Sequence, residues 1–163
     1  MTDVTAAIGA KIYIGLPAWT HATLSGYDGQ TTGWEEIGLV ESVPEHGVKW
    51  ETGSFTPVSD GLKRKYKTVR DDGTMQLTCA RKGSDAGQQA ALEAAADEQN
   101  DYPFMVVLGD DPGGTGSKPT RSYFRALVTS ATLVPGGASD TVKTNITLDV
   151  TTATIIGEAV AGT

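Results

Sequence analysis

The feature that most constrains the fold is a regular alternation of apolar and polar residues along 141–152, TVKTNITLDVTT. Successive side chains of a β-strand point to opposite faces of the sheet, so a period of two predicts a strand with one buried face and one polar face. We expect the apolar face to carry Val142, Ile146, Leu148 and Val150, and the polar face to carry Lys143, Asn145, Thr147 and Asp149.

Other segments with strand character lie on both sides of one predicted helix. The expected strands are 10–16, 34–43, 47–51, 73–82, 102–108 and 119–134, followed by an end strand within 153–163. The strand 119–134 is long enough to be bent or bulged, and Gly136 and Gly137 predict a hairpin after it. This order predicts a mainly β fold class: a two-sheet antiparallel β-sandwich or partial barrel with one flanking α-helix.

The predicted helix is 85–99, DAGQQAALEAAADEQ. Asp85 can cap its first turn, and Gln88 stands where a capping box places Glu or Gln. The apolar side of the helix is small, so we expect it to pack close to a sheet. That side is expected to hold Leu92, Ala95, Ala96 and Gln99.

The length of 163 residues predicts a single domain, 1–163. Two parts of it are expected to lack regular structure. The segment 52–72 is polar, contains Pro57 and Gly61, and predicts a long loop or arm. The last residues, about 157–163, are expected to form a flexible tail.

Charge and cysteine content exclude some classes of protein. The formal net charge of −7 argues against a protein that grips nucleic acid, because such affinity comes from neutralising phosphates. Cys79 is the single cysteine, so the fold needs no internal disulfide. It alternates onto the apolar face of 73–82 with Met75 and Leu77, which favours a core position over a nucleophilic one. We see neither a signal peptide nor a membrane span, and expect synthesis in the cytoplasm.

The sequence lacks the residues or spacings that known catalytic and metal-binding motifs require. The stretch 113–120 resembles a phosphate-binding loop, but Ser117 precedes Lys118 and a strand follows where the motif needs Gly and a helix. His21 and His46 do not have the spacing of a zinc site. We therefore expect no catalytic residues, no metal, no cofactor and no enzymatic activity.

The segment 62–70, LKRKYKTVR, is the one with unusual electrostatics. It holds five of the 13 basic residues and no acid, so the rest of the chain carries 8 basic and 20 acidic residues, a net −12. The segment could be a solvated loop, a nucleic-acid patch or an arm that docks on the acidic body of another copy. We favour the docking arm, because complementary charge sets register and partner choice. Its contact residues would be Lys63, Arg64, Lys65, Tyr66, Lys67 and Arg70.

The layout of these pieces resembles that of siphophage major tail tube proteins, the tube subunits of long-tailed bacteriophages. The pieces are an early Ile-Tyr-Ile strand, a Trp-Glu-Glu-Ile-Gly strand leading to Glu-Ser-Val, and a long loop through Phe55 and Tyr66. A Met-Gln-Leu strand, an alanine-rich helix, Pro-Phe-Met-Val-Val and a long Tyr-Phe-Arg-Ala-Leu-Val strand follow.

The resemblance implies hexameric rings that stack into a hollow tube, with inner strands closing a barrel around the channel and the long loop reaching the adjacent ring. It implies a virion tail protein, assembled in the host cytoplasm, that conducts DNA during ejection. Its partners would be further copies of itself, tail terminator and tail tip proteins, a tape measure protein and transiently DNA, but no membrane. Contractile tails and type VI secretion systems share this architecture.

The polar face of 141–152 is a candidate for the wall of the channel, with Asn145, Thr147 and Asp149 as the leading residues. An acidic and small polar surface suits DNA passage, since like charge repels phosphate and no aromatic stacks a base. The same face could instead be an outer solvated surface. A different class also stays open: a β-sandwich that serves as a capsid-decoration, adhesin or carbohydrate-binding module.

Overall fold

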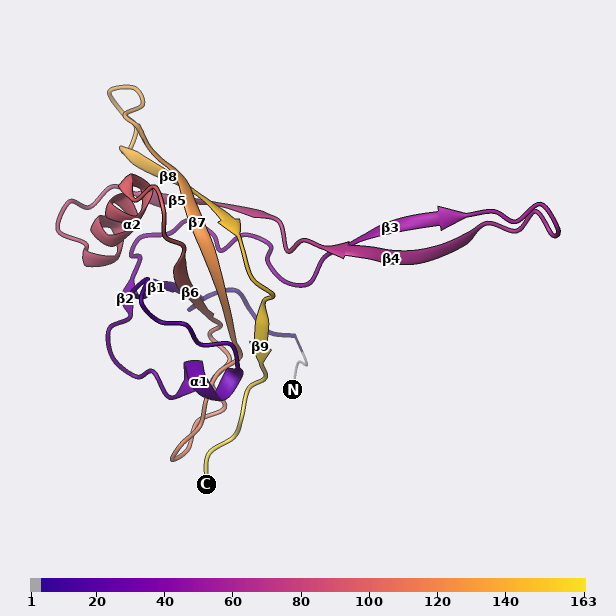
Figure 1. The fold of residues 1–163 in the computed structure, drawn as a ribbon. Coiled ribbons are helices and arrows are strands. Elements are labelled where there is room, and N and C mark those ends of the chain that lie inside the picture. Colours follow the sequence, from indigo (N-terminus) through magenta and orange to yellow (C-terminus); the bar gives the residue numbers. More distant parts are fainter. Residues whose placement is uncertain (1–3) are drawn as a thin grey trace.

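The computed structural model describes residues 4–163 as a body with one long projection. The body is a strongly curled antiparallel sheet. Figure 1 shows the helix α2 (Ala86–Ala96) on one side of this sheet and a long hairpin, β3 (Trp50–Phe55) with β4 (Arg64–Arg70), extending from the opposite side. The fold is therefore mainly β, as predicted, and its sheet forms a partial barrel.

The body sheet has seven strands, all joined by antiparallel pairs. Its order is β2-β1-β6-β7-β8-β5, and β9 pairs with the first residues of β7 along the same edge as β8. A bulge lies between Val128 and Ser130, which confirms the irregularity predicted for the long strand. The strands are β1 (Lys11–Ile14), β2 (Glu35–Glu36), β5 (Thr74–Ala80), β6 (Tyr102–Val107), β7 (Arg121–Val134), β8 (Lys143–Val150) and β9 (Ile155–Gly157).

One segment joins the two outer edges of the curled sheet. Ile37 N donates to Ile12 O of β1 over 2.9 Å, and Glu41 N donates to Thr78 O of β5, also over 2.9 Å. The strand predicted at 34–43 was therefore wrong in length, since the regular strand covers Glu35–Glu36 alone. The backbone crosses from one edge to the other here and cannot follow a single neighbouring strand.

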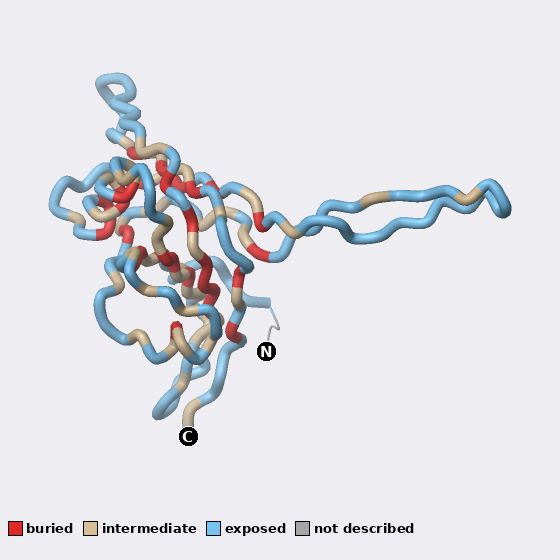
Figure 2. The backbone as a smooth tube through the Cα atoms, in the orientation of Figure 1, coloured by how far each residue is buried: buried red, intermediate tan, exposed pale blue. Residues whose placement is uncertain are grey.

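Apolar residues from the inner face of the sheet make the core. Val142, predicted on the buried face of 141–152, precedes β8 and is 41% exposed, so that part of the prediction was wrong. Met75, Leu77 and Cys79 of β5 and Ile146 and Leu148 of β8 are all buried, which confirms the two alternations for these residues. They pack with apolar residues of the other strands and of α2: Ile12, Ile14, Ala91, Ala94, Phe104, Val106, Phe124, Ala126 and Val128. Burial raises the pKa of the Cys79 thiol, as expected for a core cysteine. Figure 2 shows the buried residues concentrated in the body, while the β3–β4 hairpin is almost entirely exposed.

The helix α2 begins as predicted but presents a different face. Asp85 caps it by accepting from Gln88 N over 2.9 Å. The Gln88 side chain does not complete a capping box: its amide donates to Gly38 O and Ala80 O, and its oxygen accepts from Lys82 N. The buried residues of the helix are Gly87, Gln88, Ala91 and Ala94, so the predicted face of Leu92, Ala95, Ala96 and Gln99 was wrong. Gln88 joins the helix to the segment that links the sheet edges.

A short helix, α1 (Leu24–Asp28), lies between β1 and β2. Thr23 caps it, with its hydroxyl accepting from Gly26 N over 3.2 Å. The helix presents Tyr27, whose ring stacks on Tyr123 of β7 at 4.7 Å between centroids. It also places Asp28 against Arg121, so this stretch is anchored to the body.

The end of the chain pairs with a loop of the body. Val160 and Lys118 exchange backbone hydrogen bonds of 2.8 and 2.9 Å, and Thr163 N donates to Thr115 O over 3.1 Å. The tail expected to be flexible therefore has backbone partners in the 113–118 loop.

Candidate functional site

The hairpin of β3 and β4, termed the arm, is the first candidate surface. Its register pairs Gly53 with Tyr66 and Phe55 with Arg64. The sequence predicted a long loop or arm at 52–72 and a separate strand at 47–51. The structure has an arm, but the arm is a two-stranded hairpin and not a loop, and its first strand begins at Trp50, so it includes only the end of the predicted strand. Both faces of the arm meet solvent, so its strands lack the apolar alternation that marks a half-buried strand.

One face of the arm is basic. Cross-strand pairing places Lys67 opposite Thr52 and Lys65 opposite Ser54, which puts these lysines on the same face. Lys67 Nζ lies 5.4 Å from the centroid of the Trp50 ring, within the range of a cation–π contact. Within residues 4–163, the ammonium groups of Lys63, Lys65 and Lys67 form no ion pair with a carboxylate.

Arg64 and Arg70, which were also predicted as contact residues, have partners within the chain. Arg64 Nη2 lies 2.6 Å from Asp60 Oδ2, and both groups are well exposed. Arg70 stands at the base of the arm, where its guanidinium donates two hydrogen bonds to Asp72. Burial alone would raise the pKa of Asp72, but hydrogen bonds from Arg70, Thr154 and Lys49 hold it well below its ordinary value. Arg70 therefore anchors the arm to the body.

The tip of the arm is apolar, and the other face holds the rings of Phe55 and Tyr66 beside Arg64, a feature that sequence reasoning missed. Phe55 is 64% exposed, Leu62 is 65% exposed and Val58 is fully exposed. The Tyr66 ring lies over Gly53, where an added Cβ would stand 2.7 Å from the ring carbon Cζ. The signal was present in the sequence, as isolated apolar residues within a polar segment.

The second candidate surface is the polar face of β5, β7 and β8. The structure brings the predicted residues Asn145, Thr147 and Asp149 together on it, paired with Thr78, Gln76 and Thr74 of β5. Thr78 Oγ1 donates to Asn145 Oδ1 over 3.0 Å, and Thr74 Oγ1 donates to Asp149 Oδ1 over 3.3 Å. Ser130 and Thr132 of β7 extend the same rows. The result is a small-residue, hydroxyl- and amide-rich surface with one carboxylate.

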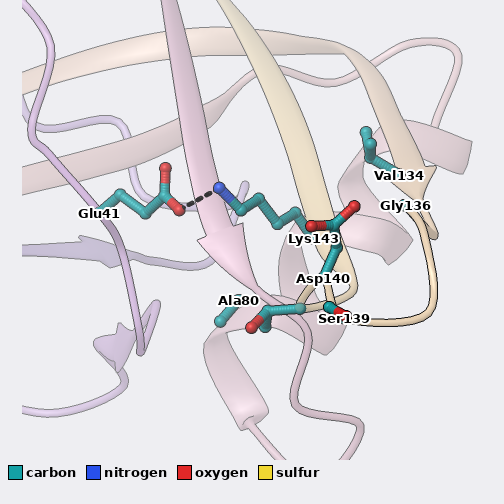
Figure 3. A pocket seen from close by; sticks show the side chains of 8 residues that line it. Glu41, Ala80, Val134, Gly136, Ser139, Asp140 and Lys143 are labelled. Carbon is teal, nitrogen blue, oxygen red and sulfur yellow. Dashed lines mark ion pairs between the residues drawn. The ribbon is translucent and has the colours of Figure 1, made fainter.

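Lys143 stands at the end of this face, beside an open pocket of about 580 Å³. Its Nζ lies 2.5 Å from Glu41 Oε1, so the cation is paired within the chain (Figure 3). Asp140, also shown there, accepts from Gly137 N over 2.7 Å. The pocket lining is Glu41, Ala80, Val134, Gly136, Ser139, Asp140, Thr141 and Lys143. Its charged groups are thus engaged with each other or with the backbone.

Across residues 4–163, no three or more His, Cys, Asp and Glu side chains gather as they would around a metal ion. The same part of the chain has no helix with the length and apolar content needed to span a membrane.

Solved structures share this fold over nearly the whole chain. The chain is similar to one from the sheath-tube complex of PVC, an extracellular contractile injection system in its extended state, with a TM-score of 0.67 and 15% identity over 97% of this chain and 93% of that chain. It is similar to a chain of the six-fold symmetrised baseplate of the anti-feeding prophage, with a TM-score of 0.71 and 8% identity over 97% and 98% of the two chains.

The chain is also similar to the SPP1 tail tube protein, with a TM-score of 0.59 and 17% identity over 95% of this chain and 80% of that chain. No protein-family model and no curated protein matches the sequence. At these identities the likeness shows the fold: the protein has a tail-tube-like fold.

Proposed function

We propose that this protein is the structural subunit of a bacteriophage-type tail tube, built from hexameric rings stacked around a channel. The observation that carries the proposal is the arm, a two-stranded hairpin held out from a body of tail-tube-like fold. It has exposed apolar residues, and its Lys63, Lys65 and Lys67 form no ion pair within residues 4–163. An isolated two-stranded hairpin is only marginally stable in water. An arm of this kind gains stability when another copy covers it.

Strand edges support closure into rings. Within residues 4–163, β6 pairs with β7 along Arg121–Ala126 and stops there. The distal half of β7, 127–134, has β8 on one side and no described strand on the other. Unpaired edges recruit strands from other chains, and closing a ring of subunits removes them. This edge is a natural place for the next subunit of a ring to pair.

The finer parts of the proposal concern the system that the tube serves. We place the subunit in a siphophage virion tail, assembled in the host cytoplasm, with terminator, tip and tape measure proteins as partners. We assign it no enzymatic role. DNA would pass along the face of Asn145, Thr147 and Asp149. A tube subunit of a contractile particle is the second candidate, favoured by the higher TM-scores with the contractile injection system and anti-feeding prophage chains.

Electron microscopy of the purified protein tests the assembly. We expect rings or tubes at high protein concentration. We expect Lys63→Glu with Lys65→Glu to reduce the tube fraction strongly, because the introduced glutamates are repelled by an acidic body where the lysines were attracted to it. The stability of the subunit should change by no more than about 0.5 kcal/mol, since both sites are exposed. The control is Arg81→Glu with Lys82→Glu, the same charge change on the body. A strictly monomeric wild type, or equal loss in both variants, would contradict the proposal.

A second prediction addresses the channel wall. Thr147→Lys with Asp149→Lys should leave tubes intact but reduce DNA delivery by particles that carry it, because the wall would then attract passing phosphates. The matched control is Glu98→Lys with Gln99→Lys, on exposed residues just after α2. Normal delivery with the Thr147 and Asp149 lysines in place would put this face on the outside of the tube.

A further inference from the structure

We propose that the arm tip of one copy docks by its apolar side chains into a groove beside the N-terminal segment of a second copy. The arm tip comprises residues 56–63, with Phe55 at its edge. The inference rests on the proposed function and deepens it, because it assigns the surface that receives the arm. It also changes the expected chemistry: the contact is apolar at its centre, with the lysines at its margin.

The arm tip is built as a fixed turn that presents apolar side chains. Gly61 N donates to Pro57 O over 2.9 Å, and Leu62 N donates to Asp60 Oδ1 over 3.0 Å. Asp60 also pairs with Arg64, so one carboxylate holds both the turn and the start of β4. Val58 and Leu62 are thereby held outward in a defined geometry. A pre-organised segment loses less conformational entropy when it binds.

The receiving groove has a volume of about 430 Å³ and is mainly apolar. It lies between the segment before β1, the segment after β2 and the end of β6. The apolar residues of its lining are Ala7, Ile8, Ala10, Val40, Val43 and Leu108. Ile8 is 85% exposed in the isolated subunit. An exposed apolar groove of this kind marks an interaction site.

The walls of the groove are held in place before any partner arrives. Ala10 N donates to Ala7 O over 3.1 Å, which closes a turn in the N-terminal wall. In the opposite wall, His46 Nε2 lies at 3.1 Å, hydrogen-bond distance, from Ser122 Oγ of β7. The groove can therefore receive a side chain without refolding of either wall.

Charge favours the arm tip of a second copy as the occupant. Glu41 lines the groove and Glu45 follows in the same segment. Each pairs with one lysine of its own chain, Lys143 and Lys49, and Glu45 keeps 83% of its side chain exposed to a further cation. Lys63 at the end of the arm tip and Lys65 just after it form no ion pair within residues 4–163. The arm extends away from its own body, so its tip meets the groove of another molecule (Figure 1).

The pocket of Figure 3 fits the arm tip less well. Ser139, Asp140, Thr141 and Lys143 make much of its lining polar, so it offers the apolar arm tip little surface to pack against. This pocket is therefore the control site for the cross-linking experiment that tests the groove.

Disulfide trapping tests the assignment. Val58→Cys is combined with Ser42→Cys in the groove, or with Ser139→Cys at the pocket of Figure 3; all three residues are exposed. Cys79 stays as it is, because it is buried. Tubes are imaged, oxidised mildly and run on a non-reducing gel. We expect a ladder of covalent oligomers with Val58→Cys and Ser42→Cys, since each copy then carries one thiol on its arm and one in its groove. We expect mainly monomer with Val58→Cys and Ser139→Cys.

The outcomes separate the two proposals. Tubes without a Val58–Ser42 ladder would overturn the groove assignment and leave the tube intact. Absence of tubes would overturn the proposed function, and a missing ladder in concentrated protein would then overturn the docking as well. As a second variant, Val58→Asp should raise the protein concentration needed for assembly by about tenfold or more. The reason is that docking would then bury a carboxylate in the groove in place of a valine side chain. Unchanged assembly by Val58→Asp would contradict apolar docking.

Discussion

Replacing Asp28 with Asn is expected to lower the free energy of unfolding by about 3 to 5 kcal/mol, the cost typical of breaking a buried ion pair. Asp28 accepts from Arg121 Nε over 2.6 Å, from Arg121 Nη2 over 2.5 Å and from Tyr123 Oη over 3.0 Å. The Arg121 side chain is only 8% exposed, so its charge would remain buried without a counter-ion. Urea denaturation of the unassembled subunit measures the change.

The control is Asp60→Asn on the arm. Asp60 also contacts an arginine at 2.6 Å, but both side chains are well exposed. An exposed pair contributes about 0 to 1 kcal/mol, so this variant should unfold almost as the wild type does. If the two variants lost the same stability, the Asp28 network would not be the anchor that its geometry indicates.

Acid pH should act on the same network. The hydrogen bonds from Arg121 hold the pKa of the Asp28 carboxyl well below its ordinary value, although burial opposes them. A carboxyl with a lowered folded-state pKa stabilises the protein above its unfolded pKa of about 4, and that contribution is lost as pH falls toward the folded value. The difference in stability between wild type and Asp28→Asn should therefore be largest near neutral pH and shrink below about pH 4.

Gly87→Ala is expected to cost about 3 kcal/mol, the upper end of the range typical of overpacking, although alanine is the better helix former. Gly87 lies in the first turn of α2, where an added Cβ would stand 2.0 Å from Glu36 O and 2.6 Å from Ile37 N. Both neighbours are backbone atoms of the segment that links the sheet edges, so they cannot rotate away. Helix propensity predicts the opposite sign, a gain of about 1 kcal/mol. Thermal and urea unfolding of the subunit distinguish the two.

Gly83→Ala is the matched control, since an added Cβ there has no heavy atom within 4 Å. It should be neutral or slightly stabilising, because alanine restricts the unfolded chain. A Gly87→Ala subunit as stable as Gly83→Ala would mean that α2 packs less closely on the sheet linkage than the structure indicates.

Several parts of the fold could be predicted from the sequence, because neighbouring residues determine them. The alternation in β5 and β8 predicted which of their side chains are buried, and it placed Asn145, Thr147 and Asp149 on one polar face. The Asp85 cap placed the start of α2. The basic residues of 62–70 marked the arm, which the structure holds in the open.

The features that decide the assembly surfaces depend on residues distant in sequence. The face that α2 buries is set by Gln88, which binds Gly38 and Ala80 on two other segments. Asp28 and Arg121 are 93 residues apart, and no local pattern marks them as partners. Within residues 4–163, Val58 and Leu62 at the arm tip stay largely exposed. The sequence of the arm carries no periodic signal, because neither face of the hairpin is buried in the subunit. Local patterning thus determined which residues of the body form strands and which faces of those strands are polar. Tertiary packing decided how the sheet curls and which charged groups are neutralised inside the body. It also decided which apolar residues are left exposed for another copy.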